Sequence, residues 1–563
     1  MDIEDIIYKY ALQNALEHGN SCQPGSVIGM VMSKNPELRK EGKLVGQLAG
    51  KITAKVNNLS AEEQQNEIDK LGGLEEHKQK QEKPKGLPEL KNVDCKEVKL
   101  RFAPNPSGPL HIGHARAAIL NMLYQKKYDG KLVLRIEDTD PKRVEPDAYE
   151  AIPEDIAWLG IKPDETYIQS DRIDIYYEYA RKAIEIGAAY MCTCDGADFK
   201  KLKDNCEACP CRDHSVEENL ELWDKLEDMK AGEAVLRVKT DIKHKNPAIR
   251  DWVAMRIVEE EHPRIGNKYR IYPMMNFSVT VDDHLLGITH VLRGKDHITN
   301  SEKQTYLYNH FGWDVPEFIH YGRLKMDDVQ LSTSKARAGI EDGTYSGWDD
   351  PRLGTIRAIA RRGIKPEVLH ELIEEIGVKQ ADATISWKKI YGLNRNIIEE
   401  NTNRFFFIPD PVEINVQNLP EENNHMIIER ELHYNKPEKG MRTLKFNGNA
   451  YIPKTDYDNA IKTKKPLRLM DLINVNVNED SCTFDSETIE EANEKHARII
   501  QWTGVEDAIK AEVVMTDNTI TTGYIENDAS MLKVNNMVQL ERFGFARVDT
   551  VTDEKIVFYY THN

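Results

Sequence analysis

The segment RFAPNPSGPLHIGH, residues 101–114, constrains the fold more than any other part of the chain. Apolar residues at 98–103 predict a strand, the following prolines and glycine predict a turn, and residues 115–127 predict a helix that opens at the second histidine. Unpaired N–H groups at a helix start suit a phosphate. Gly113 allows close approach to the backbone, and His111 and His114 can donate hydrogen bonds to phosphate oxygens. The alternative is a loop with two solvated histidines.

Length and charge limit the other possibilities. The chain has 563 residues and a formal net charge of -18, which argues against a protein that coats nucleic acid but leaves room for a local basic track. At roughly 100 to 200 residues per domain, about three to five domains are expected. No long apolar run and no signal-peptide pattern at the start are present, so we expect a cytoplasmic protein with no membrane partner.

The texture of the sequence changes several times along the chain. Residues 1–74 carry helical patterning, and 75–97 read as a polar linker. From 98 to 345, strand-like and helix-like segments alternate, which is typical of a doubly wound parallel sheet of the Rossmann type; an insertion at about 190–289 interrupts it. Residues 346–401 predict a helical connecting subdomain, and 402–563 predict one or two β-barrels. The predicted fold class is therefore multidomain, α/β plus all-β.

The run at 101–114 resembles the HIGH signature of class I aminoacyl-tRNA synthetases, and its lead-in RFAPNPSG resembles the glutamyl and glutaminyl branch. The resemblance implies a Rossmann-type catalytic domain whose insertion binds the tRNA acceptor end. Motifs at 467–472 and 541–545 resemble the anticodon-binding barrels of the archaeal glutamyl type, which the N-terminal helical module also fits. The resemblance assigns ATP binding and catalysis to Pro104, Asn105, Pro106, Ser107, Gly108, Pro109, Leu110, His111, Ile112, Gly113 and His114.

A second nucleotide-binding element is expected in the run LSTSKA at 331–336. It resembles a divergent KMSKS motif, in which Lys335 stands at the second lysine and Ser332 replaces the first. Ser334 and Lys335 are therefore the candidates for ATP binding in this loop. Amino-acid activation needs neutralisation of charge at the α-phosphate and pyrophosphate, and positioning and electrostatics can provide it.

Further residues are expected to bind glutamate. Glu137 ends a predicted strand, where doubly wound sheets bind ligands. The resemblance implies that Arg101 and Asn105 contact the substrate, that Glu137 faces the α-ammonium group, and that Tyr272 lines the side-chain pocket. For each residue alone, a surface ion pair or a core tyrosine is the alternative.

Arg293 decides the expected choice between glutamate and glutamine. An arginine fork pairs with a γ-carboxylate and matches a neutral amide poorly. A structural ion-pair role for Arg293 is the alternative. The resemblance, with Arg293 favouring glutamate, implies a glutamate-tRNA ligase that uses L-glutamate, ATP with Mg²⁺ and tRNA-Glu, with tRNA-Gln as a second candidate substrate. A glutaminyl enzyme and a catalytically silent tRNA-binding relative are the competing hypotheses.

Five of the eight cysteines lie between Cys192 and Cys211. Cys192, Cys194, Cys209 and Cys211 could supply four thiolates to a structural Zn²⁺ ion that closes the insertion. Cys206 and His214 are spare ligands, and reduced thiols without a metal are the alternative. A saturated four-cysteine site has no open position, so a catalytic role is not expected.

Overall fold

The computed structural model describes residues 2–17, 19–71, 86–93, 97–326 and 329–563. It divides into two compact units, Met1–Lys85 and Gly86–Asn563. Most of the expected linker at 75–97 lies outside the described residues. In the part of the chain that the structure describes, no helix is both long and apolar enough to cross a lipid bilayer.

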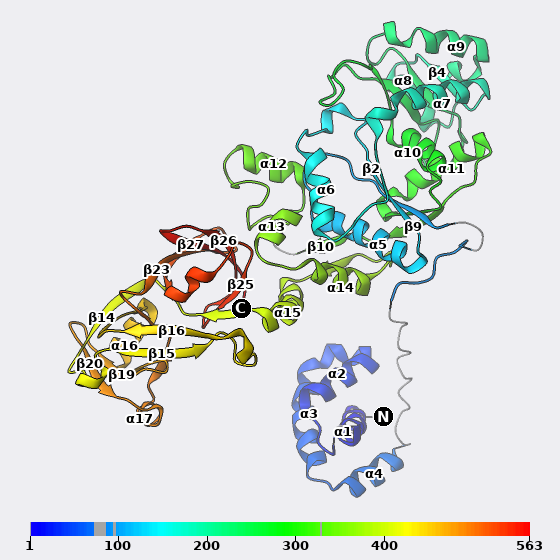
Figure 1. The fold of residues 1–563 in the computed structure, drawn as a ribbon. Helices are drawn as coiled ribbons and strands as arrows, with labels where there is room; N and C mark the ends of the chain where they lie inside the picture. Colours follow the sequence, from blue (N-terminus) through cyan, green and yellow to red (C-terminus); the bar gives the residue numbers. More distant parts are fainter. Residues whose placement is uncertain (1, 18, 72–85, 94–96, 327–328) are drawn as a thin grey trace. The chain divides into compact units, whose positions relative to one another are not determined.

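The first unit consists of helices, as the sequence predicts (Figure 1). Pro24 occupies the first turn of its helix, and Ser60 and Glu63 form a capping box before the last helix. The helices are α1 (Ile3–Glu17), α2 (Pro24–Lys34), α3 (Gly42–Asn57) and α4 (Ala61–Lys70). Their buried side chains include Ile7, Ala11 and Val45, so the helical periodicity of the sequence corresponds to one shared core.

Parallel strands form the centre of the second unit. Strand β1 pairs with β2, β2 pairs with β3, and β8 pairs with β9, all in parallel. The start of β8 is joined to β1, because Thr289 N–H donates to the Lys99 carbonyl at 2.9 Å and Lys99 N–H donates to Thr289 Oγ1 at 2.9 Å. The strands are β1 (Lys99–Phe102), β2 (Lys131–Ile136), β3 (Glu165–Ile168), β8 (His290–Gly294) and β9 (Glu317–Tyr321). The parallel sheet that resumes after an insertion is therefore confirmed.

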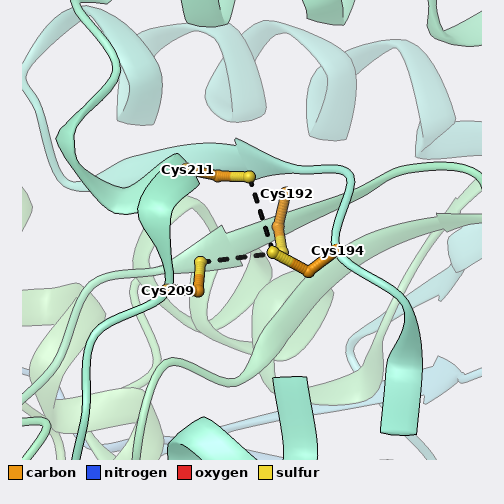
Figure 2. A group of neighbouring side chains, drawn as sticks. All are labelled: Cys192, Cys194, Cys209 and Cys211. Carbon is orange, nitrogen blue, oxygen red and sulfur yellow. Dashed lines mark hydrogen bonds between the residues drawn. The ribbon is translucent and has the colours of Figure 1, made fainter. Parts of the chain in front are cut away.

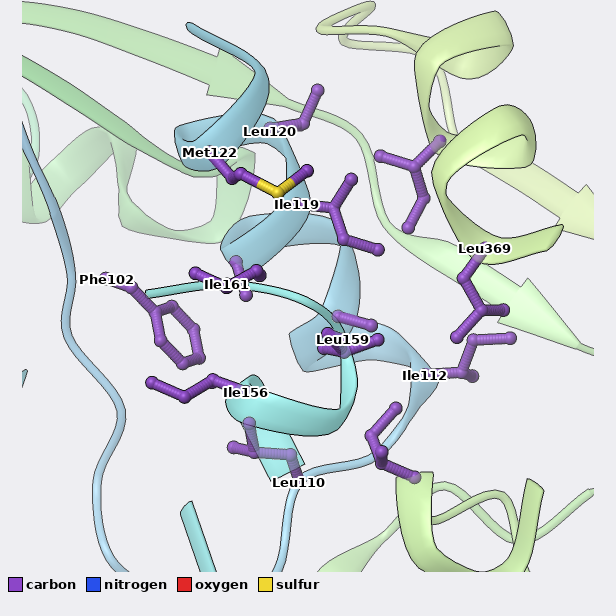
Figure 3. Close-up of a cluster of buried hydrophobic side chains, with 14 of the residues drawn as sticks. Phe102, Leu110, Ile112, Ile119, Leu120, Met122, Ile156, Leu159, Ile161 and Leu369 are labelled. Atoms are coloured by element: carbon purple, nitrogen blue, oxygen red, sulfur yellow. The ribbon is translucent and has the colours of Figure 1, made fainter. Parts of the chain in front are cut away.

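Helices pack on this sheet through a continuous apolar core (Figure 3). Phe102 from β1 and Leu369 from α14 belong to the same cluster as Ile112 and Ile119 of α5. The helices concerned are α5 (Ile112–Tyr128), α6 (Ala148–Trp158) and α14 (Pro366–Ile376). Helix α5 begins at Ile112, earlier than the expected start at the second histidine, because His111 caps it. The strand, the turn and the helix of the opening motif are thus fixed by one core.

The insertion is built on an antiparallel sheet in the order β4-β5-β6-β7. Its elements are β4 (Ala189–Cys192), α8 (Gly196–Asp204), α9 (Val216–Asp224), β5 (Val235–Val238), β6 (Val253–Ile257) and β7 (Ile271–Pro273). Helix α7 (Ile173–Glu185), which precedes the expected start of the insertion at about residue 190, contributes to the same apolar core. Helices α10 (Met275–Leu285) and α11 (Ile298–Phe311) lie on either side of β8 in the sequence. The sheet of the insertion is therefore antiparallel, whereas the central sheet is parallel.

The connecting region is helical apart from one short strand. Pro366 opens α14, as predicted, but β11 pairs in parallel with β10 inside the stretch expected to be helical. The further elements of this region are α13 (Ile356–Arg361), β11 (Ala383–Ile385) and α15 (Trp387–Ile398). Strand β10 (Leu324–Met326) and helix α12 (Thr333–Glu341) precede it in the chain. Three residues of strand are too few to interrupt the apolar pattern of a helical sequence, so β11 depends on its partner strand.

Most of the C-terminal region consists of two seven-stranded sheets. The positions of their edge strands along the chain explain why each sheet is barrel-like. The edge strands of one sheet are β12 (Asn403–Phe405) and β13 (Phe407–Pro409), and those of the other are β21 (Arg498–Ile500) and β22 (Thr503–Gly504). In each case the two edges are nearly consecutive in the chain, so each sheet curls back toward its own first strand. The first sheet also contains β23 (Ala508–Val514), β24 (Ile520–Glu526), β25 (Met537–Leu540), β26 (Gly544–Val551) and β27 (Lys555–His562). The second contains β14 (Pro411–Gln417), β17 (Asn449–Pro453), β18 (Leu467–Leu469), β19 (Asn474–Val477) and β20 (Cys482–Ser486).

A buried ion-pair network joins a hairpin to these sheets. In the hairpin of β15 (Met426–Glu431) and β16 (Met441–Phe446), Arg442 is fully buried and contacts the carboxylates of Glu526 and Glu541. Arg430 and Arg442 lie over the ring of Phe406, at 4.8 and 4.7 Å from its centroid. Removing Arg442 would leave two buried carboxylates without their partner, which is more costly than losing a surface pair.

Candidate active site

His111 and His114 form the start of α5 rather than projecting freely from it. Nδ1 of His111 accepts a hydrogen bond from Gly113 N–H at 3.0 Å, and Nδ1 of His114 accepts one from His111 N–H at 3.3 Å. The two rings stack with centroids 3.8 Å apart. Since each Nδ1 is an acceptor, the neutral rings carry their proton on Nε2, where it can be donated to a phosphate.

The expectation of free amide groups at this helix start is wrong. Ile112 N–H donates to the Gly354 carbonyl at 3.0 Å, and the amides of His114 and Ala115 donate to the His111 carbonyl at 2.8 and 3.1 Å. A Cβ atom on Gly113 would lie 2.8 Å from the His111 ring, so the missing side chain at Gly113 makes room for that ring. The imidazoles, rather than the backbone, are therefore the donors available for a phosphate.

Both imidazoles are neutral at pH 7. Burial lowers the pKa of His111 to about 4. Burial lowers the pKa of His114 to about 3, and repulsion from His111, once that ring is protonated, acts in the same direction. A phosphate at this site would therefore meet two neutral N–H donors, and the cationic charge must come from elsewhere.

The lysine-bearing loop lies directly against the turn of the opening motif. A Cβ atom on Gly108 would approach Thr333 Cγ2 to 2.7 Å and the ring of Trp348 to 3.3 Å. Gly108 has φ = 142°, a conformation that favours glycine, so both its backbone and its contacts require this residue. Ser334 and Lys335 are exposed in the first turn of α12. The structure thus brings together the two nucleotide-binding elements expected from the sequence.

Arg101, Glu137 and Arg293 gather at the carboxyl ends of β1, β2 and β8, around the buried Arg135 and Asp283. Arg135 contacts Asp283 at 2.6 Å and Glu137 at 2.9 Å. Arg101 Nε lies 3.5 Å from Asp283 and has no hydrogen-bond partner. Burial raises the pKa of Glu137, although Arg135 and Arg101 oppose the shift. An ammonium group bound beside Glu137 would favour its charged form.

Arg293 is held by neutral partners rather than by a carboxylate. Its Nη1 donates to Gln304 Oε1 at 2.9 Å and to Ser301 Oγ at 3.4 Å, while Nε has no partner. Burial and the nearby Arg101 lower the pKa of Arg293 to about 10, so the guanidinium still carries its charge at pH 7. Among the described residues, no carboxylate contacts Arg293 directly, although the alternative of a structural ion-pair role would require such a contact. A buried cation without a direct counter-ion suits an anionic ligand.

Tyr272 and Asn105 complete the expected set. Tyr272 is 1% exposed on β7, and its hydroxyl has no partner. Burial and Asp138 raise its pKa to about 12, so the hydroxyl remains a donor. Asn105 is exposed, and its side-chain N–H donates to the Glu137 carbonyl at 3.0 Å. The amide therefore links the turn to the end of β2.

Sequence reasoning missed the residues that hold this group in place. Arg135 and Asp283 are each no more than 1% exposed, and neither was assigned a role. The adjacent acids Asp282 and Asp283 within the apolar helix α10 were the available signal, because buried carboxylates require partners. Arg337, which follows the lysine loop, was also missed; it donates to the Ser107 carbonyl at 2.5 Å.

The four expected cysteines converge in the insertion (Figure 2). Their Sγ atoms all lie within 4.8 Å of one another, with Cys192–Cys209 at 3.9 Å and Cys194–Cys211 at 3.7 Å. Four thiolates at about 2.3 Å from a tetrahedral zinc would be separated by about 3.8 Å. The spacing fits a structural zinc site, and the spare residues Cys206 and His214 are not part of the cluster.

Comparison with known families agrees with this geometry. Residues 97–400 match the family described as tRNA synthetases class I (E and Q), catalytic domain. Residues 402–495 and 499–549 match its anti-codon binding domains. The chain belongs to the class I tRNA synthetases of the E and Q branch.

Relatives that match over their full length are similar to this chain within the glutamyl part of this branch. A glutamate–tRNA ligase of Methanosphaera stadtmanae is 76% identical over 563 residues, which is 100% of each chain. Proteins with the same name from Methanobrevibacter smithii and Methanocaldococcus jannaschii are 60% and 47% identical, again over 100% of each chain. The expected resemblance to archaeal glutamyl enzymes is confirmed.

The half-buried His111 and His114 predict a dependence of stability on pH. Unfolded histidine binds a proton near pH 6.5, whereas folded His111 and His114 do so only near 4 and 3. The unfolded state therefore binds more protons between these values, and stability falls as the pH is lowered from 6.5 toward 4. His111→Asn combined with His114→Asn should flatten this slope in thermal melts between pH 7.5 and 5. His310→Asn, at an exposed histidine, is the control; equal slopes in both variants would contradict the assignment.

Proposed function

We propose that this chain is a glutamate–tRNA ligase. It forms glutamyl-adenylate from L-glutamate and ATP with Mg²⁺, and then transfers the glutamyl group to the 3′ end of tRNA. Full-length identity of 76% to a glutamate–tRNA ligase is the observation that carries this assignment, because it spans the catalytic and the C-terminal regions together. The alternatives are a glutaminyl enzyme and a silent tRNA-binding relative.

The first step places two anions side by side. An oxygen of the glutamate α-carboxylate attacks the α-phosphorus of ATP, and the bond to pyrophosphate breaks. The Nε2–H groups of His111 and His114 donate to the phosphate oxygens, and Lys335 neutralises charge on the departing pyrophosphate, assisted by the hydroxyl of Ser334. The turn before α5 and the first residues of this helix hold the two imidazoles in place. These residues are Pro104, Asn105, Pro106, Ser107, Gly108, Pro109, Leu110, Ile112 and Gly113. A ribose hydroxyl of the tRNA then attacks the activated carbonyl, and AMP leaves.

Glutamate carries two carboxylates, and the site offers two arginines whose Nε makes no hydrogen bond, Arg101 and Arg293. Arg293 is assigned to the γ-carboxylate and Arg101 to contacts nearer the backbone of the substrate. Glu137 binds the α-ammonium group, the Tyr272 hydroxyl donates a hydrogen bond within the side-chain pocket, and Asn105 contacts the substrate from the turn. Discrimination against glutamine follows from the poor match between a buried guanidinium and a neutral amide.

The partner tRNAs are tRNA-Glu and, as a second candidate, tRNA-Gln, and the reaction takes place in the cytoplasm. Incubation with labelled glutamate, ATP and each transcript should yield charged tRNA-Glu. Charging of tRNA-Gln as well would extend the substrate range. Failure to charge either transcript, with binding retained, would favour the silent relative.

Substitution of the two arginines separates their roles. Arg293→Ala should lower kcat/KM for glutamate by on the order of 100- to 1,000-fold, because a buried charged contact to the γ-carboxylate is lost. The same variant should have little effect on the weak reaction with glutamine. Arg101→Ala should impair both amino acids alike. Unchanged glutamate kinetics in Arg293→Ala would overturn the pocket assignment.

We further propose that Cys192, Cys194, Cys209 and Cys211 hold one structural Zn²⁺, which would cross-link β4 to the segment around Cys211. The purified protein should contain about one zinc per chain by mass spectrometry. Cys209→Ser should lose the metal and lower the melting temperature, while Cys482→Ser, at a buried cysteine outside the cluster, should retain the metal. Full zinc content in Cys209→Ser would contradict the site.

A further inference from the structure

Arg337 connects the lysine-bearing helix to the opposite side of the nucleotide site. It lies in α12, and its Nη2 donates to the Ser107 carbonyl at 2.5 Å. Its Nη1 contacts Glu145 Oε1 at 2.6 Å. One guanidinium therefore bonds to two acceptors that belong to the region following β1 and β2, about 200 residues earlier in the chain.

Both acceptors are themselves attached to the histidine-bearing turn. Ser107 belongs to that turn, and Glu145 N–H donates to the carbonyl of Pro106 at 2.8 Å. The contact of Gly108 with Thr333 places the first turn of α12 on the same surface. Arg337 thus adds a charged contact beside an apolar one, and the two together fix the helix at two points.

The charge pattern of the loop gives this contact its significance. Between residues 329 and 337 the basic side chains are Lys335 and Arg337, since Ser332 stands where a lysine was expected. Residues two apart in a helix point about 200° apart around its axis. When Arg337 is bonded to the turn, the rotation of α12 is set, and the direction in which Lys335 leaves the helix is set with it.

We propose that Arg337 is a positioning residue, which holds α12 against the turn through Glu145 and the Ser107 carbonyl and thereby fixes Lys335 relative to His111 and His114. The inference builds on the proposed function, because it concerns the same adenylation step. Arg337 does not contact the nucleotide in this account. Its bonds organise the side of the site that carries the cationic charge.

The kinetic signature should be a loss of kcat rather than of binding. Arg337→Ala should lower the rate of glutamate-dependent ATP–pyrophosphate exchange, with tRNA present, by about 10- to 100-fold, because a displaced catalytic group is costly even when its own contacts are intact. The KM for glutamate and the Kd for tRNA should change less than about threefold. The exchange rate of Arg337→Lys should lie between those of the parent protein and Arg337→Ala, because an ammonium group lacks the planar fork that reaches both acceptors.

Charge reversal distinguishes positioning from general damage. Arg337→Glu should be at least as impaired as Arg337→Ala, since it places two carboxylates together. Combining it with Glu145→Arg should recover about tenfold of the exchange rate, because the ion pair is restored in the opposite sense. Lys389→Ala, which removes a surface pair with Glu375 at 2.5 Å in the connecting region, is the matched control and should behave as the parent protein.

Hydrogen–deuterium exchange tests the contact without any reliance on activity. Arg337→Ala should speed exchange of the amides in residues 333–341 in the absence of substrates, and Lys389→Ala should not. Unchanged protection of this helix in Arg337→Ala would overturn the contact. An unchanged exchange rate of ATP and pyrophosphate, or no recovery in the charge-reversed pair, would overturn the positioning role. If the parent protein itself lacks glutamate-dependent activity, the proposed function fails, and amide exchange still decides whether the contact exists.

Discussion

The arrangement of the active site depends on the buried guanidinium of Arg135. It is fully buried and contacts Asp283 and Glu137 directly, with Asp282 at 3.9 Å. These contacts tie β2 to α10 and hold Glu137 at the end of its strand. Asp283 and Glu137 have their closest cationic contacts with Arg135, whereas Asp282 also pairs with Arg172 at 2.8 Å. Removing Arg135 would leave the buried Asp283 without its main partner, which should strongly destabilise this geometry.

In the proposed mechanism, two regions that are distant in the sequence would share the contacts to the nucleotide. The histidines would supply neutral donors, because burial lowers the pKa of each imidazole, and the exposed Lys335 would supply the cationic charge. The Gly354 carbonyl accepts a hydrogen bond from Ile112 N–H, and the side chain of Thr333 packs against Gly108. The two regions are therefore already in contact, and ATP would bind to a largely preformed site.

The sequence predicted the parallel sheet, the barrels and the family because these depend on local periodicity and on motifs that are continuous in the chain. The exact start of α5 at Ile112 and the strand at Ala383–Ile385 were missed, since one depends on capping by His111 and the other on pairing with β10. Arg135, Asp283 and Arg337 were missed for a related reason. Their partners are fixed by tertiary contacts, and the adjacent acids Asp282 and Asp283 within an apolar helix were the one signal that the sequence offered. The individual roles assigned to Arg101, Glu137, Tyr272 and Arg293 stay predictions.

The proposed pocket beside the class I nucleotide site distinguishes a charged amino-acid side chain from a neutral one. The most direct measurement compares, by calorimetry, the binding of two non-reactive adenylate analogues, glutamyl-sulfamoyl-adenosine and glutaminyl-sulfamoyl-adenosine, to the complex with tRNA-Glu. The account predicts that the glutamyl analogue binds at least about 100-fold more tightly, because only it pairs a carboxylate with the buried guanidinium. Equal affinity, or a preference for the glutaminyl analogue, would contradict it.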